Sequence, residues 1–202
     1  MGQWLPIFLN LRDKPVLLVG AGEIATEKLP KLFESGAKVK VVAKSVIPEM
    51  QQYIDERSDS ITLAIRPVEA RDFDNVFLVL SAIDDSELNT TLRAWAHERN
   101  TLFNAADQAA HCDFFMTGTV RRGPLTIAVS SEGTHPGLTR AVRKFLEEVL
   151  PTEHLESIKD LTTLRARLRR VLPDPSIRLK ALRRLTAGIE SEYFGHAKET
   201  LQ

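Results

Sequence analysis

An apolar run of strand length that ends in two closely spaced glycines is the feature that most constrains this chain. The run covers residues 15–19; Gly20 and Gly22 follow, and the small Ala25 comes three positions later. This order of strand, G-x-G-x-x-A and helix suits a dinucleotide pyrophosphate, because the first glycine allows a tight turn and the second lets backbone amides approach the phosphates. The helix N-terminus adds unpaired N–H groups and a positive dipole end. The stretch therefore predicts a dinucleotide site, and its alternative is a tight turn without a ligand.

The contacts predicted around this turn come from two segments. The turn itself supplies these candidate cofactor-binding residues: Gly20, Ala21, Gly22, Glu23 and Ile24. The carboxylate that usually binds the adenosine ribose after the second strand is missing, since that strand is followed by Ala43, Lys44 and Ser45. Lys44 either favours the 2′-phosphate of NADP or simply faces solvent, whereas Ser45 and backbone groups would serve NAD. We expect Ala43 and Lys44 to line the cofactor site.

Strand and helix patterns alternate over residues 15–104. After the first strand, the predicted strands cover residues 38–42, 61–65, 76–81 and 102–104. A first helix is predicted from about residue 24 to a stop at Ser35-Gly36, and two more cover residues 47–54 and 85–99. A short strand is also predicted at residues 5–11. The alternation predicts an α/β fold with a Rossmann-type, doubly wound parallel sheet and right-handed crossovers.

The pattern changes at about residue 113. Residues 114–120 and 125–129 are β-rich, and the sequence between them is typical of a hairpin turn. A long amphipathic helix is predicted at residues 136–149, with Thr134 as a candidate N-cap, and two further helices are predicted at residues 154–171 and 176–188. We therefore predict three parts: a Rossmann domain at 1–113, a small β-rich unit at 114–150 and a C-terminal helical domain at 151–202.

Composition and charge exclude several classes of protein. The 202 residues include 27 basic and 27 acidic side chains, which argues against a strongly basic nucleic-acid binder. No apolar run reaches membrane length, and the N-terminus does not resemble a signal peptide. Cys112 is the only cysteine, so intramolecular disulfides and thiolate zinc clusters are excluded and a cytoplasmic location fits. Between Arg140 and Arg184, twelve Lys or Arg stand against six Asp or Glu, either as solvated helix faces or as a surface for a polyanionic ligand.

The ends of the fourth and fifth strands supply further candidates, because the carboxyl ends of parallel strands line the cofactor crevice. We expect Ser81, Ala82 and Asp84 to contact the cofactor from the end of the fourth strand. Asn104 is expected to do so from the end of the fifth. Asp85 suits an N-cap of the following helix, although a cofactor contact is compatible with that role.

Two loops carry the candidates for chemistry. Asp107 follows the fifth strand, and its carboxylate acts either as a general base near the nicotinamide or as part of an Asx turn. The loop before the long helix offers hydroxyls and free amides to a carboxylate or phosphate, although helix capping alone would explain them. Its candidate substrate-binding residues are Ser130, Ser131, Gly133, Thr134 and His135. The adjacent residues 111–113 rarely share one tetrahedral ion, so we predict no metal site.

Taken in order, these segments resemble one family. The shared motifs are Leu-Pro-Ile-Phe at 5–8, Val-Gly-Ala-Gly at 19–22, Ala-Ile-Asp-Asp at 82–85 with Asn89, Asn-Ala-Ala-Asp at 104–107, Phe-Phe at 114–115, Arg-Arg-Gly-Pro-Leu-Thr-Ile-Ala-Val-Ser-Ser at 121–131 and Gly-Thr-His-Pro at 133–136. Over residues 3–150 the chain resembles the precorrin-2 dehydrogenase and sirohydrochlorin ferrochelatase family, whose module also forms the N-terminal half of siroheme synthase. The block at 121–131 is the most specific motif, because generic nucleotide binding does not require it.

The resemblance implies an activity, partners and residue roles. Members of the family oxidise precorrin-2 to sirohydrochlorin with NAD⁺ as hydride acceptor, and several also insert Fe²⁺ or Co²⁺ into the product. They form homodimers through the unit that matches residues 114–150. Asp107 matches their candidate base, and the loop 130–134 matches their tetrapyrrole pocket. The many carboxylates of precorrin-2 would give the basic stretch after Arg140 a partner.

The chain also departs from the family pattern. Lys44 stands where a proline is common, which leaves the cofactor contacts there open. No methyltransferase half follows, so we expect a separate enzyme to make precorrin-2.

Two other functions stay open on the sequence. One is an NAD(H)-sensing regulatory module without catalysis, in which the helical tail contacts a partner protein; such a sensor would not need the block at 121–131. The other is an NADP-dependent oxidoreductase acting on a small acidic metabolite, which Lys44 mildly supports. Whether metal insertion accompanies the oxidation also stays open.

Overall fold

A computed structural model of the chain describes residues 4–106, 108–150, 167–168 and 170–189. The chain divides into two compact units, one formed by residues 1–116 with 130–135 and the other by residues 117–129 with 136–202. Within the described residues, no helix is long and apolar enough to cross a membrane.

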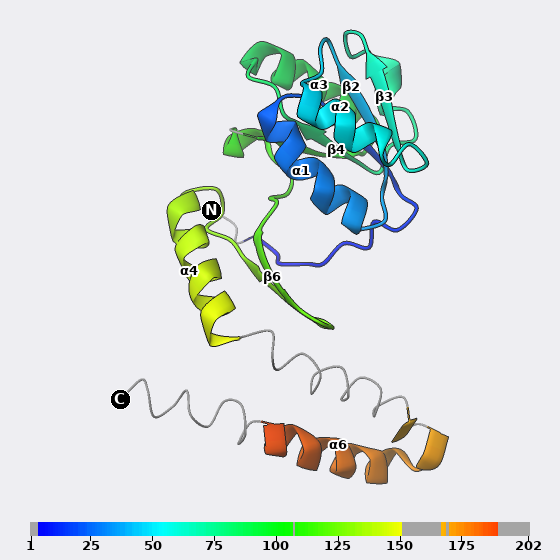
Figure 1. Cartoon of the computed structure of the whole chain (residues 1–202), viewed down its shortest axis with the longest axis vertical. Helices are drawn as coiled ribbons and strands as arrows, with labels where there is room; N and C mark the ends of the chain where they lie inside the picture. The colour runs from blue at the N-terminus through cyan, green and yellow to red at the C-terminus, as the bar shows by residue number, and fades with distance from the viewer. Residues whose placement is uncertain (1–3, 107, 151–166, 169, 190–202) are drawn as a thin grey trace. The chain divides into compact units, whose positions relative to one another are not determined.

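A five-stranded parallel sheet forms the centre of the first unit (Figure 1). Its strand order is β3-β2-β1-β4-β5, so the chain runs outward from the middle strand and then returns to its other side. The strands are β1 (Pro15–Val19), β2 (Lys38–Ala43), β3 (Ile61–Ile65), β4 (Leu78–Ser81) and β5 (Leu102–Ala105). The direction of winding reverses between β1 and β4, and a crevice at the carboxyl ends of these strands is where such sheets bind ligands.

Helices cover both faces of this sheet. They are α1 (Glu23–Glu34), α2 (Pro48–Asp55) and α3 (Ser86–Glu98). Val16 and Leu18 of β1 pack in one apolar cluster with α1 and α2. Leu17 and Val19 pack in a second cluster with α3. Because both faces are buried, β1 is a continuous apolar run rather than an alternating one.

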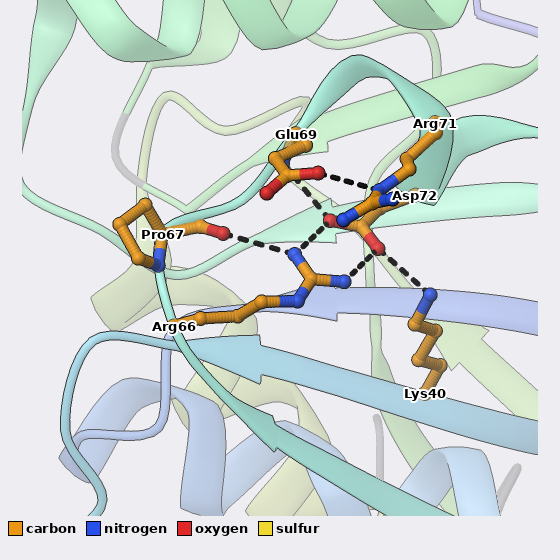
Figure 2. Close-up of polar contacts among 6 residues, drawn as sticks. All are labelled: Lys40, Arg66, Pro67, Glu69, Arg71 and Asp72. Carbon is orange, nitrogen blue, oxygen red and sulfur yellow. Dashed lines mark hydrogen bonds and ion pairs between the residues drawn. The ribbon is translucent and has the colours of Figure 1, made fainter.

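The crossover from β3 to β4 is built differently from the others. Residues 66–77, all of which the structure describes, form only the 3₁₀ turn η1 (Ala70–Phe73) instead of an α-helix. Asp72 of this turn is fully buried as a side chain, and its Oδ1 lies 2.7 Å from Lys40 Nζ of β2 and 2.6 Å from Arg66 Nη2 (Figure 2). Arg66 Nη1 also donates to Asp72 Oδ2 over 2.7 Å. These three charged side chains tie the turn to the sheet where a helix would otherwise cover it.

The second unit contains an antiparallel hairpin and helices. Strands β6 (Gly118–Arg122) and β7 (Leu125–Val129) pair with Gly118 opposite Val129. The helix α4 (Pro136–Val149) packs on this hairpin, and a Cβ at Gly118 would lie 2.9 Å from Thr139 Cγ2. Arg122 of β6 donates to the backbone carbonyls of Glu147 and Leu150 at the C-terminus of α4. A later helix, α6, covers Pro175–Ile189.

The predicted fold class is confirmed: a parallel α/β sheet, a small antiparallel unit and C-terminal helices. Most element boundaries lie within two residues of the prediction. The predicted helix at 154–171 falls largely on residues 151–166 and 169, which lie outside the described part of the chain.

Two predicted strands differ from the structure. The predicted strand at residues 5–11 is wrong, because residues 4–10 are in no strand and leave Leu5 80% and Phe8 71% exposed. An alternating apolar pattern forms a strand only where a neighbouring strand completes its hydrogen bonds. The first hairpin strand begins at Gly118 rather than residue 114. The carbonyl of Phe114 accepts a hydrogen bond from the Asn104 side chain instead.

Candidate functional site

The glycine turn after β1 is held in place by its two neighbouring strands. Gly20 has a φ of +100°, and a Cβ at this position would lie 2.6 Å from the backbone oxygen of Ala82, just after β4. The Gly20 amide donates to the Val42 carbonyl of β2 over 2.9 Å. Only glycine fits this combination of positive φ and close backbone approach, so Gly20 fixes the turn itself.

Gly22 differs, because nothing in the protein lies within 4 Å of where its Cβ would stand. It is the N-cap of α1, and no side chain caps that helix end. Ala25 is fully buried in the first cluster, as the fingerprint requires. The space in front of Gly22 and the uncapped helix N-terminus fit a pyrophosphate. The turn therefore has the shape and the polarity to bind the middle of a dinucleotide.

The other predicted contacts lie around this turn, and all but Ala21 and Ala43 are exposed. Glu23 and Ile24 are exposed in the first turn of α1. Ala43 is buried at the end of β2, and Lys44 beyond it is exposed. The Ile47 amide donates to the Ala21 carbonyl over 3.2 Å, which brings the loop after β2 against the glycine turn.

The end of β4 is built on an internal polar pair. Ser81 is completely buried, and its Oγ donates to Asn89 Oδ1 of α3 over 2.6 Å. Asn89 Nδ2 in turn donates to the Ile83 carbonyl over 3.3 Å. Ser81 thus shapes the loop after β4 through its hydroxyl, a role that sequence reasoning missed because Asn89 meets it only after α3 has packed.

The two aspartates after β4 have different surroundings. Asp85 Oδ1 accepts from the Leu88 amide over 2.9 Å, so the predicted N-cap role of Asp85 is confirmed. Asp84 is exposed, and Ala82 is half-buried beside the glycine turn. Ala82 and Asp84 therefore border the same edge of the sheet as Gly22.

Asn104 at the end of β5 is 4% exposed and is held by two contacts. Its Nδ2 donates to the Phe114 carbonyl over 2.8 Å and to Cys112 Sγ over 3.3 Å. Cys112 Sγ donates to the carbonyls of Ala105 and Gln108 at 3.2 and 3.3 Å. Burial raises the pKa of the Cys112 thiol, so it stays protonated at neutral pH. These hydrogen bonds connect the end of β5 to residues 108–114 and so hold together the two ends of the loop that follows the strand.

The candidate base Asp107 lies on that loop but outside the described residues. Other residues after β5 have their own hydrogen-bond partners. His111 Nδ1 contacts Gln108 Oε1 at 2.9 Å, and Asp113 Oδ2 accepts from the Phe103 amide over 2.9 Å. His97 Nε2 also lies 3.0 Å from Asp113 Oδ2. In the part of the chain that the structure describes, no three His, Cys, Asp or Glu side chains form a group that could hold a metal ion.

The serine loop 130–135 belongs to the first unit. Gly133 has a φ of +76°, and its Cβ position lies 3.2 Å from both Ala109 Cβ and Phe115 Cε1. Ser131 Oγ accepts from the His135 amide over 3.1 Å. The loop therefore packs against Ala109 and Phe115 of the segment that follows β5. Phe115 is next in sequence to Phe114, whose carbonyl accepts from Asn104. Sequence reasoning gave neither Ala109 nor Phe115 a role at this loop, because only the tight fit at Gly133 reveals that role.

Other side chains of the serine loop are arranged by local hydrogen bonds. The Glu132 amide donates to Ser130 Oγ over 3.0 Å, and Thr134 Oγ1 donates to the Ser131 carbonyl over 2.5 Å. The Thr134 hydroxyl is thus engaged within the loop rather than with an amide of α4. Ser130, Gly133, Thr134 and His135 are all exposed. The loop presents polar groups to solvent beside the carboxyl end of β5.

A doubly wound parallel sheet with an open glycine cradle at its switch point defines a dinucleotide-binding α/β protein. Residues 7–118 match the family described as putative NAD(P)-binding, and the chain belongs to that family. Over 94% of its length it also matches the solved structure of SirC, precorrin-2 dehydrogenase, with a TM-score of 0.79 and 25% identity, covering 92% of that chain.

Curated relatives point the same way. The chain is 37% identical over 170 residues to a siroheme synthase of Zymomonas mobilis, covering 84% of this chain and 36% of the relative. It is 39% identical over 148 residues to siroheme synthase 1 of Serratia proteamaculans, covering 73% and 31% of the two chains. The chain thus spans about a third of the length of these relatives. The resemblance to the N-terminal module of siroheme synthase is confirmed.

Proposed function

We propose that this chain is an NAD-dependent precorrin-2 dehydrogenase of the cytoplasm that oxidises precorrin-2 to sirohydrochlorin. One observation carries the proposal: the cofactor cradle at Gly22 and the serine loop seated on Phe115 occur in one unit of a chain that matches SirC along its length. A nucleotide sensor would need the cradle but not the serine loop.

The proposed mechanism divides the work between cofactor and protein. NAD⁺, when bound, supplies the hydride acceptor. The turn from Gly20 to Ile24 would bind the pyrophosphate. Ser81 would shape the loop after β4, and Asn104 would lie beneath the nicotinamide end of the cofactor. The residues that would border the cofactor are Ala43, Lys44, Ala82 and Asp84. The carboxylate of Asp107 would accept the proton that the macrocycle loses as the hydride leaves.

The substrate would be bound by the serine loop. Precorrin-2 carries many carboxylates, for which Ser130, Ser131, Gly133, Thr134 and His135 offer amides and polar side chains. The sequence of α6 contains four basic residues and no acidic one. Arg178 donates to the Leu172 and Pro173 carbonyls, while Lys180 and Arg183 are exposed. This surface suits a polyanion better than a neutral ligand.

We further propose that the protein is a homodimer. Residues 114–150 would form its dimerisation and substrate-pocket unit, which follows the Rossmann domain (1–113) in the sequence and precedes the helical domain (151–202). A two-stranded hairpin is marginal on its own in water. The helix α4 that covers it leaves an apolar stripe exposed on its outer side. A second copy of the chain would bury that stripe.

The direct test is anaerobic incubation of the purified protein with precorrin-2 and NAD⁺. We expect the absorption spectrum of sirohydrochlorin to appear together with that of NADH, and to be absent when NAD⁺ is omitted. Parallel reactions with NADP⁺ test the preference at Lys44, and later addition of Fe²⁺ or Co²⁺ tests metal insertion. Binding of NAD⁺ without turnover of precorrin-2 would favour the regulatory module instead.

Asp107→Ala is expected to reduce the oxidation rate at least about a hundredfold, because general-base catalysis typically contributes that much. The affinity for NAD⁺ should stay near that of the unmodified protein, as measured by calorimetric titration. Asp59→Ala, which alters an exposed carboxylate on the loop before β3, is the matched control and should leave both values unchanged. Full turnover by the Asp107 variant would remove this residue from the mechanism.

A further inference from the structure

The side-chain oxygen of Asn104 is a buried acceptor without a donor. Among the described residues, Asn104 Oδ1 is one of two buried side-chain polar atoms that have no hydrogen-bond partner. A buried oxygen in this state is destabilising to the protein, and native structures rarely keep one without a functional reason.

The orientation of this amide is set by its neighbours. Nδ2 donates to the Phe114 carbonyl over 2.8 Å and to Cys112 Sγ over 3.3 Å, so both of its N–H groups are used. Turning the amide over would place Oδ1 against the Phe114 carbonyl, and two acceptors would then face each other. The oxygen is therefore held on the opposite side, toward a position that calls for an N–H or O–H donor.

The position of Asn104 in the sheet shows which part of a dinucleotide it would meet. Asn104 pairs with Leu80 of β4, and β5 is the second strand from β1, on the side away from β2. Neighbouring strands are about 4.8 Å apart, so β5 lies roughly 10 Å from the pyrophosphate cradle. In this fold the adenosine lies over β2, which directs the nicotinamide half toward β4 and β5.

We propose that Asn104 Oδ1 accepts a hydrogen bond from the carboxamide N–H of the nicotinamide and so positions the ring for hydride transfer. This inference rests on the proposed function. Phosphates and carboxylates carry only acceptors at neutral pH and cannot satisfy this oxygen, whereas the carboxamide brings a donor. Because the oxygen is covered in the structure, the groups around it must move aside as the carboxamide enters. The new hydrogen bond offsets this cost, since it gives the buried acceptor a donor.

The test compares NAD⁺ with 3-acetylpyridine adenine dinucleotide, in which a methyl group replaces the amide nitrogen. Both dinucleotides are titrated calorimetrically in the absence of tetrapyrrole, so that no N–H group of the substrate can donate to Asn104 Oδ1. We expect the unmodified protein to bind the analogue about tenfold more weakly than NAD⁺, the effect of losing one hydrogen bond to a buried acceptor. Equal affinities would overturn this inference alone, whereas failure of NAD⁺ itself to bind would overturn the proposed function with it.

Variants locate the effect at the oxygen. Asn104→Leu should bind NAD⁺ and the analogue equally, both about as weakly as the unmodified protein binds the analogue. If that variant does not fold, the ratio of the two affinities in the unmodified protein still decides the inference. Cys112→Ala is the matched control, because it removes a neighbour of Nδ2 but not the acceptor, and it should retain the tenfold preference. Loss of the preference in Cys112→Ala would contradict a specific role of Oδ1.

Discussion

At the scale of single residues, Gly20 and Gly22 illustrate two reasons for a glycine in one motif. Gly20 is required by the protein, because its φ is +100° and the Ala82 oxygen would be 2.6 Å from a Cβ. Gly22 is not required by any contact within the protein, since the space around its Cβ position is empty. We therefore expect Gly20 to matter for stability and Gly22 for cofactor binding.

Gly22→Val is expected to abolish measurable NAD⁺ binding while changing the free energy of unfolding by less than about 1 kcal/mol, the size of an N-cap effect. Gly20→Ala is expected to cost about 1–3 kcal/mol of stability, because it places a side chain in a strained left-handed conformation against a backbone oxygen. Calorimetric titration and urea unfolding of both variants check this. Unchanged NAD⁺ affinity in Gly22→Val would show that the phosphates bind elsewhere.

At the scale of elements, the charged cluster at η1 is the main departure from a regular crossover. Burial by itself would raise the pKa of Asp72, but hydrogen bonds from Arg66, Lys40 and the Glu69 amide outweigh it and hold the pKa well below its usual range. The side chains of Lys40 and Arg66 are 43% and 31% exposed, so water screens part of the attraction. The cluster adds to the apolar contacts of Phe73, the η1 residue that is fully buried in the second apolar cluster.

Asp72→Ala is expected to lower the free energy of unfolding at pH 7 by about 1–3 kcal/mol, because it removes a buried acceptor of several charged donors. Asp74→Ala is the matched control: Asp74 is exposed, its ion pair with Arg99 at 2.8 Å lies on the surface, and its loss should cost less than about 1 kcal/mol. Urea unfolding of the two variants beside the unmodified protein provides the comparison. Equal effects of the two substitutions would contradict a special role for the buried carboxylate.

The contribution of Asp72 should also depend on pH. Its folded pKa lies below the unfolded value of about 4, so its stabilisation is fully present above that value. It is lost progressively as the pH falls from about 4 toward and through the folded pKa. The difference between the unmodified protein and Asp72→Ala should therefore shrink as the pH is lowered from about 4 to about 3, where urea unfolding can follow it. A difference that stayed constant over this range would show that the charge is not responsible.

At the scale of the whole molecule, α4 bears a stripe that the second unit does not cover. Leu138, Val142, Phe145 and Val149 recur at spacings of four, three and four residues and are 58%, 37%, 55% and 50% exposed. This spacing is that of a helix seam that pairs with another helix. A monomer would keep all four side chains in water, so the stripe supports the proposed homodimer.

Replacing Leu138 or Phe145 by Glu is expected to weaken the dimer at least about thirtyfold, because a charge in a desolvated interface costs roughly 2 kcal/mol or more. Sedimentation equilibrium measures the dissociation constant. Lys144→Glu, an exposed charge change on the same helix but outside the stripe, is the control and should leave association much closer to normal. A protein that is monomeric before substitution, or dimeric variants with unchanged association, would refute the role of this stripe.

The sequence by itself determined the elements whose signals are local. Apolar periodicity placed β1 to β5 and α1 to α4, and the glycine spacing located the tight turn after β1. The cap of α3 by Asp85 was predictable because donor and acceptor are only three residues apart. Such features depend on neighbours in the chain, so no knowledge of packing is needed to infer them.

Only the tertiary structure decided which distant residues meet. Asp72 is buried and forms an ion pair with Lys40, and Asn104 donates a hydrogen bond to Cys112. Residues 4–10 have no strand partner. The tertiary structure also grouped the serine loop with the first unit rather than with the hairpin that precedes it. These outcomes depend on which buried polar groups find partners once the sheet has formed, and that competition involves residues far apart in the chain.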